Sequence, residues 1–417
     1  MTIAIMPDGD GVSPTLAANE LAASLRREGR TILHMGFGEA PFPVHPRLAR
    51  ALEDGAGARS YLPVAGLPEL REAVARHHER VAGLTMDGHD VLVGPGSKAI
   101  LFAIELAVPG DTLLPVPSWV SYRPQATMLG RAVIDVPTTI DERGLVIEAD
   151  ALDRTIHAAR AAGRNPTKIV LNSPSNPTGL VIPDGSLRDI AEVCGRHDIL
   201  IVSDEIYGRL AFDGGYGTIA RHAPERTVVT TGLSKHLSLG GWRVGVGLVP
   251  RAIGELFPTL TMIASETWSC VASPVQWAAV EAYAGHDDVE DFIALSRRIH
   301  ADVTGVVAER LQGMGVSCIR PQGGFYLWPE VPCRGGAARI DTSTDLSRVL
   351  LQDCGIVTLP GTAFGERPET LRLRLSACDY DGAAALAAYE RGAPNDIGAF
   401  APRISAALDG FEAFLAT

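Results

Sequence analysis

Short, uninterrupted runs of apolar residues recur through the first 249 residues of the chain. Each run is rich in Val, Ile and Leu and is bounded by Gly, Pro, Asn or Asp. A run without polar alternation is typical of a strand that is buried on both faces. We therefore predict strands at residues 90–93, 111–115, 133–136, 168–171, 199–203, 227–230 and 244–249.

Apolar residues at helical spacing lie between and after these runs. In residues 67–81, for example, Leu70, Val74 and Val81 share one side and charged residues occupy the other. Residues 32–43 contain several Gly and Pro residues, which indicates a strand end that runs into a loop. The predicted helices are 16–27, 67–81, 98–107, 187–197, 275–284, 289–311 and 401–415.

Strands that alternate with helices predict an α/β fold. The main domain should contain a mainly parallel sheet sandwiched between helices. The remainder, residues 312–417, alternates strand and helix and indicates a smaller α+β domain. The apolar stripe of the last helix is typical of core or interface packing.

Composition excludes several classes of protein. The chain has 417 residues, 46% of them hydrophobic and 21% charged, which argues against a disordered or fibrous protein. A net charge of −12 and scattered arginines predict no nucleic-acid partner. No apolar stretch approaches the ~20 residues of a membrane span, so we expect no membrane association.

The N-terminus and the cysteines both favour a cytoplasmic protein. Residues 1–10 lack the basic and apolar segments of a signal peptide. The cysteines form no C-x-x-C pair and no histidine lies at metal-ligand spacing from them, so we expect reduced thiols and no metal. They are Cys194, Cys270, Cys318, Cys333, Cys354 and Cys378.

The candidate chemical residues follow the predicted strands, where open α/β sheets place their ligands. Lys235 follows one buried run inside a Gly-rich loop, and Arg243 comes eight residues later. A partly desolvated lysine is a potential Schiff-base nucleophile, and an arginine nearby would neutralise a phosphate. Taken alone, a lysine in such a position is more often an ordinary surface residue. The spacing between Lys235 and Arg243 inside the Gly-rich loop favours the functional interpretation.

Four other strand ends carry candidates that also have ordinary structural explanations. An Asp that follows a strand often caps a helix, and a Trp often belongs to the core. An Asn-Pro pair or a Gly-rich segment often only forms a turn. A helix N-terminus also attracts phosphate, and a Trp can stack on a flat ring. These candidates are Asp204 with Tyr207, Asn176, the Gly96-Ser97-Lys98 turn and Trp119.

Taken together, and in their order along the chain, these segments resemble the class I/II aminotransferase family. Members of this family are fold-type I enzymes that depend on pyridoxal 5'-phosphate. The resemblance covers residues 32–376 and is carried by N-P-T-G at 176–179, D-x-x-Y at 204–207 and S-K-x(7)-R-x-G at 234–245. It implies an N-terminal arm and substrate loop at 1–45 that is part of the small domain. It also implies a large cofactor-binding domain at 46–285 and a small C-terminal domain at 286–417.

The resemblance also implies a role for each matching residue. Lys235 would form the Schiff base and move the proton, and Asp204 would pair with the pyridine nitrogen. Tyr207 and Asn176 would hydrogen-bond the phenolic oxygen of the cofactor. The phosphate would be held by Gly96, Ser97, Lys98, Ser234 and Arg243, and by Tyr61 of a neighbouring subunit. Substrate would contact Gly38, Trp119 (also stacked on the ring), Asn176 and Arg374, whose guanidinium would clamp the α-carboxylate.

Three features depart from the family pattern. Many relatives have a serine three residues before the lysine, where this chain has Gly232, and the usual G-E-P-D-F loop reads G-E-A-P-F at 38–42. Residues 252–296 contain no Arg or Lys, although dicarboxylate-specific relatives often draw a partner's arginine from this region. This absence argues against aspartate as the substrate, unless a basic residue from another segment takes the same role.

The resemblance implies an aminotransferase that moves an amino group between an amino acid and a 2-oxo acid, acting as a homodimer with shared sites. One alternative keeps the cofactor and lysine but performs elimination, replacement, carbon–carbon bond formation or oxidation. A cofactor-sensing regulator is disfavoured, because such chains need an added DNA-binding domain with a basic helix, whereas fewer than about 40 residues precede the substrate loop and the chain is acidic overall.

Overall fold

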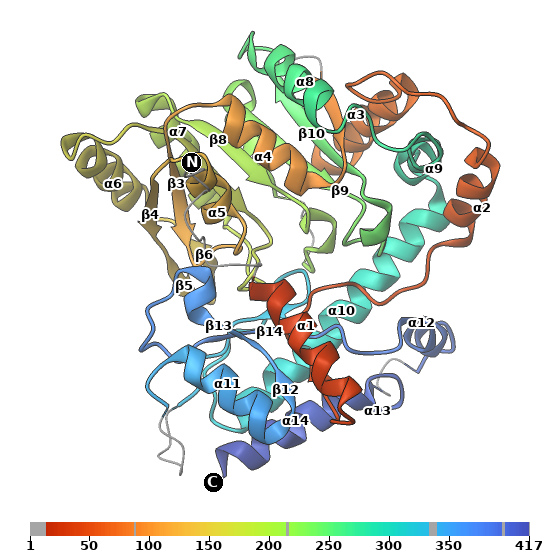
Figure 1. Cartoon of the computed structure of the whole chain (residues 1–417), viewed down its shortest axis with the longest axis vertical. Helices are drawn as coiled ribbons and strands as arrows, with labels where there is room; N and C mark the ends of the chain where they lie inside the picture. Colours follow the sequence, from red (N-terminus) through yellow and green to blue (C-terminus); the bar gives the residue numbers. More distant parts are fainter. Residues whose placement is uncertain (1–13, 87–88, 214–216, 333–339, 394–396, 417) are drawn as a thin grey trace, which may run out of the picture.

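Figure 1 shows a computed structural model of the chain. It describes residues 14–86, 89–213, 217–332, 340–393 and 397–416, with side chains from residue 20 onward. The segment 1–10 and Cys333, on which two of the sequence predictions rest, lie outside the described residues.

A seven-stranded sheet with the order β2-β10-β9-β8-β7-β3-β4 forms the centre of the molecule. β10 is antiparallel to both of its neighbours, whereas β9, β8, β7, β3 and β4 are paired in parallel. The predicted mainly parallel sheet is therefore confirmed, and every predicted strand is present. The strands are β2 (His89–Gly94), β3 (Asp111–Val116), β4 (Val133–Pro137), β7 (Pro166–Asn172), β8 (Leu200–Asp204), β9 (Thr227–Gly232) and β10 (Gly245–Pro250).

Helices cover both faces of this sheet (Figure 1). Ile201 packs into a cluster with α6 and α7, while the next residue, Val202, packs into a different cluster with α4 and α8. Both faces are buried, which explains why the strands lack polar alternation. The covering helices are α3 (Pro68–Ala82), α4 (Ser97–Ala107), α5 (Tyr122–Met128), α6 (Ala149–Ala161), α7 (Asp184–His197), α8 (Leu256–Thr267) and α9 (Ser273–Tyr283).

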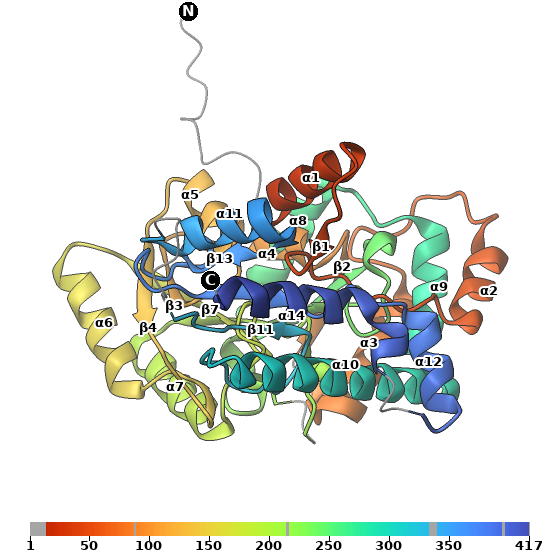
Figure 2. The same ribbon diagram turned by 90° about the horizontal axis from the view of Figure 1, so that it is seen from below.

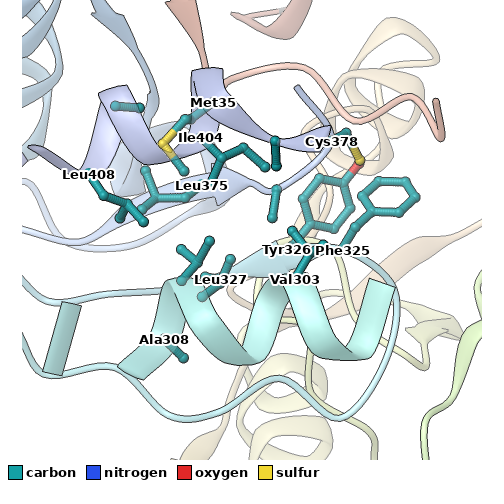
Figure 3. Packing of buried hydrophobic residues seen from close by; sticks show 14 of the residues in the cluster. Met35, Val303, Ala308, Phe325, Tyr326, Leu327, Leu375, Cys378, Ile404 and Leu408 are labelled. Carbon is teal, nitrogen blue, oxygen red and sulfur yellow. The ribbon is translucent and has the colours of Figure 1, made fainter. Parts of the chain in front are cut away.

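A second layer of short strands and long helices packs beside the sheet. Figure 2 shows α14 (Pro402–Leu415) running alongside α10 (Asp287–Gly313) and α11 (Ser343–Cys354), with which it is in contact. The strands are β11 (Tyr326–Leu327), β13 (Leu359–Pro360) and β14 (Leu373–Ser376), in the order β11-β14-β13. Side chains of the helices form one buried cluster with side chains of two of the strands, β11 and β14, and part of this cluster is shown in Figure 3.

The N-terminal segment joins this second layer. β1 (Leu33–His34) pairs in parallel with β12 (Ile356–Val357), and Met35 lies in the same cluster as Ile404 (Figure 3). α10 links both parts, because Ile293 packs with the sheet helices and Val303 packs in the second layer. The exact division of the chain at residues 45 and 285 stays a prediction.

Several elements escaped prediction from the sequence. α8 carries apolar residues on all sides, so its helical period is weak, and α5 spans only seven residues. α6 and α2 (Pro46–Gly55) were also missed. The remaining described α-helices and β-strands are α1 (Pro14–Arg27), the hairpin β5 (Thr139–Asp141) and β6 (Gly144–Val146), α12 (Gly382–Glu390) and α13 (Ile397–Phe400).

Within the described ranges, no helix combines the length and apolarity needed to cross a bilayer. The five described cysteines are free thiols, as expected.

Candidate active site

A cavity of about 360 Å³ lies at the sheet edge where the parallel strands β3, β7, β8 and β9 end. Asn172 and Asp204 are the last residues of β7 and β8, and Lys235 follows β9. The second layer contributes Tyr326 and Arg374 to the opposite wall. The predicted residues that line this cavity are Gly38, Ser97, Lys98, Trp119, Asn176, Asp204, Tyr207, Ser234, Lys235, Arg243 and Arg374.

Lys235 presents a half-buried amine to this cavity. Its Nζ donates a 2.7 Å hydrogen bond to the Gly38 carbonyl, and burial lowers its pKa to about 8. A larger fraction of neutral amine is therefore present near neutral pH than for an exposed lysine. The sequence contains only two other lysines. Lys98 also lines the cavity, and Lys168 is buried elsewhere against Glu105.

Asp204 is a buried carboxylate at the end of β8. The Tyr122 hydroxyl donates a 2.7 Å hydrogen bond to its Oδ2, and the backbone N–H of Ile206 donates to Oδ1. Burial raises its pKa to about 6, and the bond from Tyr122 opposes that rise. Such a carboxylate gains most from a cationic N–H partner placed in the cavity.

Tyr207 and Asn176 occupy the wall next to Asp204. The Tyr207 hydroxyl lies 3.0 Å from the Tyr326 hydroxyl. The backbone N–H of Asn176 donates to Asn172 Oδ1 at 2.7 Å, which fixes the turn after β7. The Asn172 side chain in turn donates to the main-chain oxygen of Asp204 at 2.8 Å. These bonds hold two adjacent strand ends in register at the cavity.

Arg374 is a buried cation on β14 with no carboxylate within 4.0 Å among the described residues. Its Nη1 donates to Asn176 Oδ1 at 3.3 Å, its Nη2 donates to the Gly36 carbonyl, and its Nε has no hydrogen-bond partner. The guanidinium lies 4.6 Å from the ring centroid of Tyr326 and 5.3 Å from that of Phe364. A buried unpaired cation costs free energy, which a bound carboxylate would offset.

The N-terminus of α4 forms an anion-binding corner. Gly96 precedes the helix with φ of 87°, and a Cβ at this position would lie 2.2 Å from Nη2 of Arg243. Lys98 lies over the Trp119 ring at 4.9 Å, and burial followed by the charge of Arg243 lowers its pKa. Two adjacent cations at a helix N-terminus favour a doubly charged anion such as phosphate.

The departure at Gly232 has a local physical reason. A Cβ there would lie 2.5 Å from the carbonyl oxygen of Val244 and 3.1 Å from the Cα of Gly245. Any larger residue would force β9 and β10 apart. The loss of one serine hydroxyl is therefore tied to the close approach of two strands, and Ser234 still lines the cavity.

Tyr61 does not reach this cavity within one chain. Its side chain is 91% exposed, and it is absent from the cavity lining. Its predicted contact with a phosphate therefore requires a second subunit, and that contact stays a prediction.

Sequence reasoning missed several polar and aromatic residues of the site. Tyr122 and Tyr326 are the main ones, because both contact predicted site residues directly. No sequence signal marks either tyrosine, since each reaches the cavity through tertiary packing. The other residues that were missed are Phe37, Glu39, Ser121, Asn172, Ile206 and Gly240.

One group of potential metal ligands lies on the surface, on α6 and α7. Asp153, His157 and His197 bring their ligand atoms within 4.8 Å of one another. Arg196 and Arg160 contact the same Asp153 carboxylate and His197 ring, so positive side chains already occupy the positions around them. The expectation of a metal-free protein stays a prediction.

Comparison with known proteins agrees with the arrangement of residues in the cavity. Residues 30–388 match the family described as aminotransferase class I and II. The chain belongs to this family.

Individual aminotransferases are similar over nearly their whole length. An asparagine–oxo-acid transaminase of Streptococcus mutans is 33% identical over 375 residues, covering 87% of this chain and 91% of that protein. The structure of aspartate aminotransferase from Rhizobium meliloti superposes with a TM-score of 0.83 and 27% identity, covering 100% of this chain and 99% of that one. The structure of Thermus thermophilus aspartate aminotransferase with maleate superposes with a TM-score of 0.81 and 28% sequence identity, covering 96% of each chain.

The protein is therefore an aminotransferase that moves an amino group between an amino acid and an oxo acid. Aminotransferases of this class depend on pyridoxal phosphate, and the predicted family, fold type and enzyme class are all confirmed. The elimination, replacement and oxidation alternatives have no counterpart among the relatives named above.

Proposed function

We propose that this aminotransferase binds pyridoxal 5'-phosphate covalently on Lys235 and uses it to transfer amino groups. The observation that carries the proposal is the placement of four complementary groups around one cavity. They are a half-buried amine at Lys235, a buried carboxylate at Asp204, two cations at the N-terminus of α4, and the Arg374 guanidinium, which has no carboxylate partner among the described residues.

The residues fit the cofactor at each of its functional groups. Ser97, Lys98, Ser234 and Arg243 would hold the phosphate, together with the start of α4. Asp204 would accept a hydrogen bond from the protonated ring nitrogen. Tyr207 and Asn176 would face the phenolic oxygen and Trp119 the ring. When bound, pyridoxal phosphate supplies an aldehyde for the amine and a ring that withdraws electrons from the substrate Cα.

The remaining chemistry belongs to two side chains of this protein. Arg374 binds the α-carboxylate and orients the Cα–H bond toward Lys235. The Lys235 amine would act as the general base that removes this proton from the substrate Cα. A lowered pKa suits this role, because a neutral amine is needed before each proton transfer.

We further propose a cytoplasmic homodimer with shared sites. The exposed Tyr61 supports shared sites, since an aromatic side chain that is 91% exposed gains from a partner surface. The substrates would be a free amino acid and a 2-oxo acid. Relatives named for aspartate, prephenate and asparagine make these the first donors and acceptors to test.

The decisive experiment is a panel of amino acids incubated with the purified enzyme and pyridoxal phosphate, with and without 2-oxoglutarate. Transamination requires that product formation depends on the oxo acid. Turnover without an acceptor would instead indicate elimination or oxidation. Borohydride reduction followed by peptide mass analysis should place the cofactor on Lys235, with Lys98 and Lys168 as internal controls.

A further inference from the structure

Tyr326 connects the two ends of the candidate active site. It is the first residue of β11, whose partner strand β14 carries Arg374. Its hydroxyl lies 3.0 Å from the hydroxyl of Tyr207, and its ring lies 4.6 Å from the guanidinium of Arg374. Figure 3 shows its side chain next to Phe325. One side chain therefore touches both a predicted cofactor contact and the predicted substrate clamp.

The substrate loop also packs on this hydroxyl. A Cβ built at Gly38 would lie 1.9 Å from the Tyr326 hydroxyl oxygen, so only glycine permits this approach. The carbonyl oxygen of Gly38 accepts the hydrogen bond from Nζ of Lys235. Tyr326 thus sets the position of the loop that holds the reactive amine.

The hydrogen bond between the two phenols has a favoured direction. Both side chains are buried, and the Arg374 cation lies against the Tyr326 ring. A cation at a phenol ring makes its hydroxyl more acidic, and the charge of Arg374 opposes the rise that burial causes in the pKa of Tyr326. The more acidic phenol is the better donor. Either hydroxyl can donate across the 3.0 Å separation, and donation by Tyr326 would leave the proton of Tyr207 free to point into the cavity.

We propose that Tyr326 is a positioning residue, which donates to Tyr207 so that the Tyr207 hydroxyl donates to the bound cofactor, and which supports the Arg374 guanidinium through its ring. This inference rests on the proposed function, because the acceptor of the Tyr207 proton is the phenolic oxygen of pyridoxal phosphate. It assigns the hydroxyl and the ring of one side chain to two separable tasks.

The test compares Tyr326→Phe, which removes only the hydroxyl, with Tyr326→Leu, which also removes the ring. A weaker donor at Tyr207 leaves more negative charge on the phenolic oxygen, and that charge holds the proton of the neighbouring lysine–cofactor nitrogen. In Tyr326→Phe the pH midpoint of the visible absorbance should rise by roughly half a unit to one unit, with KM for the amino acid nearly unchanged. In Tyr326→Leu the KM should also rise several-fold.

Tyr380→Phe is the matched control, since that buried phenol bonds to His300 Nδ1 at 3.1 Å and is absent from the cavity lining. Its pH midpoint should equal that of the unaltered enzyme. An unchanged or lowered pH midpoint in Tyr326→Phe would overturn the inference. A purely structural role of Tyr326 would alter stability and cofactor loading but would leave the pH midpoint unchanged. If the unaltered enzyme takes up no pyridoxal phosphate, the proposed function fails instead.

Discussion

The Tyr122 hydroxyl donates a 2.7 Å hydrogen bond to Oδ2 of Asp204, and both side chains are buried. Asp204 would be costly as an unaccompanied buried anion, and Tyr122 is a side-chain donor that the protein places beside it. Tyr122 begins α5 and Asp204 ends β8, so the bond joins a helix on one face of the sheet to the sheet edge.

Tyr122→Phe should destabilise the cofactor-free protein in a pH-dependent manner. Burial raises the pKa of Asp204 to about 6, so its carboxylate is largely ionised at pH 8 and largely protonated at pH 5. A hydrogen bond to an ionised group is worth about 1.5–3 kcal/mol and a neutral one about 0.5–1.5 kcal/mol. Urea unfolding should therefore show a larger loss at pH 8 than at pH 5.

Tyr380→Phe provides the control for this measurement. Burial lowers the pKa of its partner His300 to about 3, so that ring is neutral at both pH values. The loss of stability in the Tyr380→Phe protein should therefore be equal at pH 5 and pH 8. Equal losses in the Tyr122→Phe protein as well would contradict the role assigned to the Tyr122–Asp204 bond.

Uptake of pyridoxal phosphate by the cofactor-free protein should reach its full rate at a lower pH than an ordinary lysine allows. Condensation needs the neutral amine, and burial lowers the pKa of Lys235 from 10.5 to about 8. The rate, followed by absorbance, should level off above about pH 8, whereas a lysine in a short peptide should still accelerate toward about pH 10. A rate that keeps rising in the protein would show that the Lys235 amine is not desolvated.

Arg374→Lys should weaken substrate binding by at least about tenfold. A lysine keeps the charge but loses the planar fork that binds a carboxylate with two bonds. KM for the amino acid should therefore rise while cofactor content stays the same. Arg372→Lys is the control, since Arg372 precedes the same strand and pairs with Glu330 and Glu366 at the surface. Equal KM values for the two variants would argue against the clamp.

Tyr61→Phe should hold pyridoxal phosphate more weakly, because it loses a hydroxyl that is predicted to reach the phosphate of the partner. An unchanged dissociation constant for the cofactor would reject this contact. A sharper test mixes Tyr61→Ala subunits with Lys235→Ala subunits. If sites are shared, each mixed dimer holds one intact site, and activity should recover to about a quarter of the normal value. No recovery would indicate that Tyr61 serves its own subunit or none.

The sequence by itself determined the sheet and most of the cavity lining. Strands buried on both faces need apolar residues at every position, so β7 and β8 were visible as plain apolar runs. Parallel strands end at one common edge in any order, so polar residues after such runs must gather there. This is why Asn176, Asp204 and Lys235 were predicted together although they lie far apart in the chain.

Only the tertiary structure decided how the second layer meets the sheet. β11 and β14 are two and four residues long, and such short strands carry too little pattern to fix their register from sequence. The contact between Tyr207 and Tyr326 spans 119 positions and depends on how α10 orients that layer. A local pattern reports which face of an element is buried, whereas the partner of a buried side chain is set by packing among distant elements.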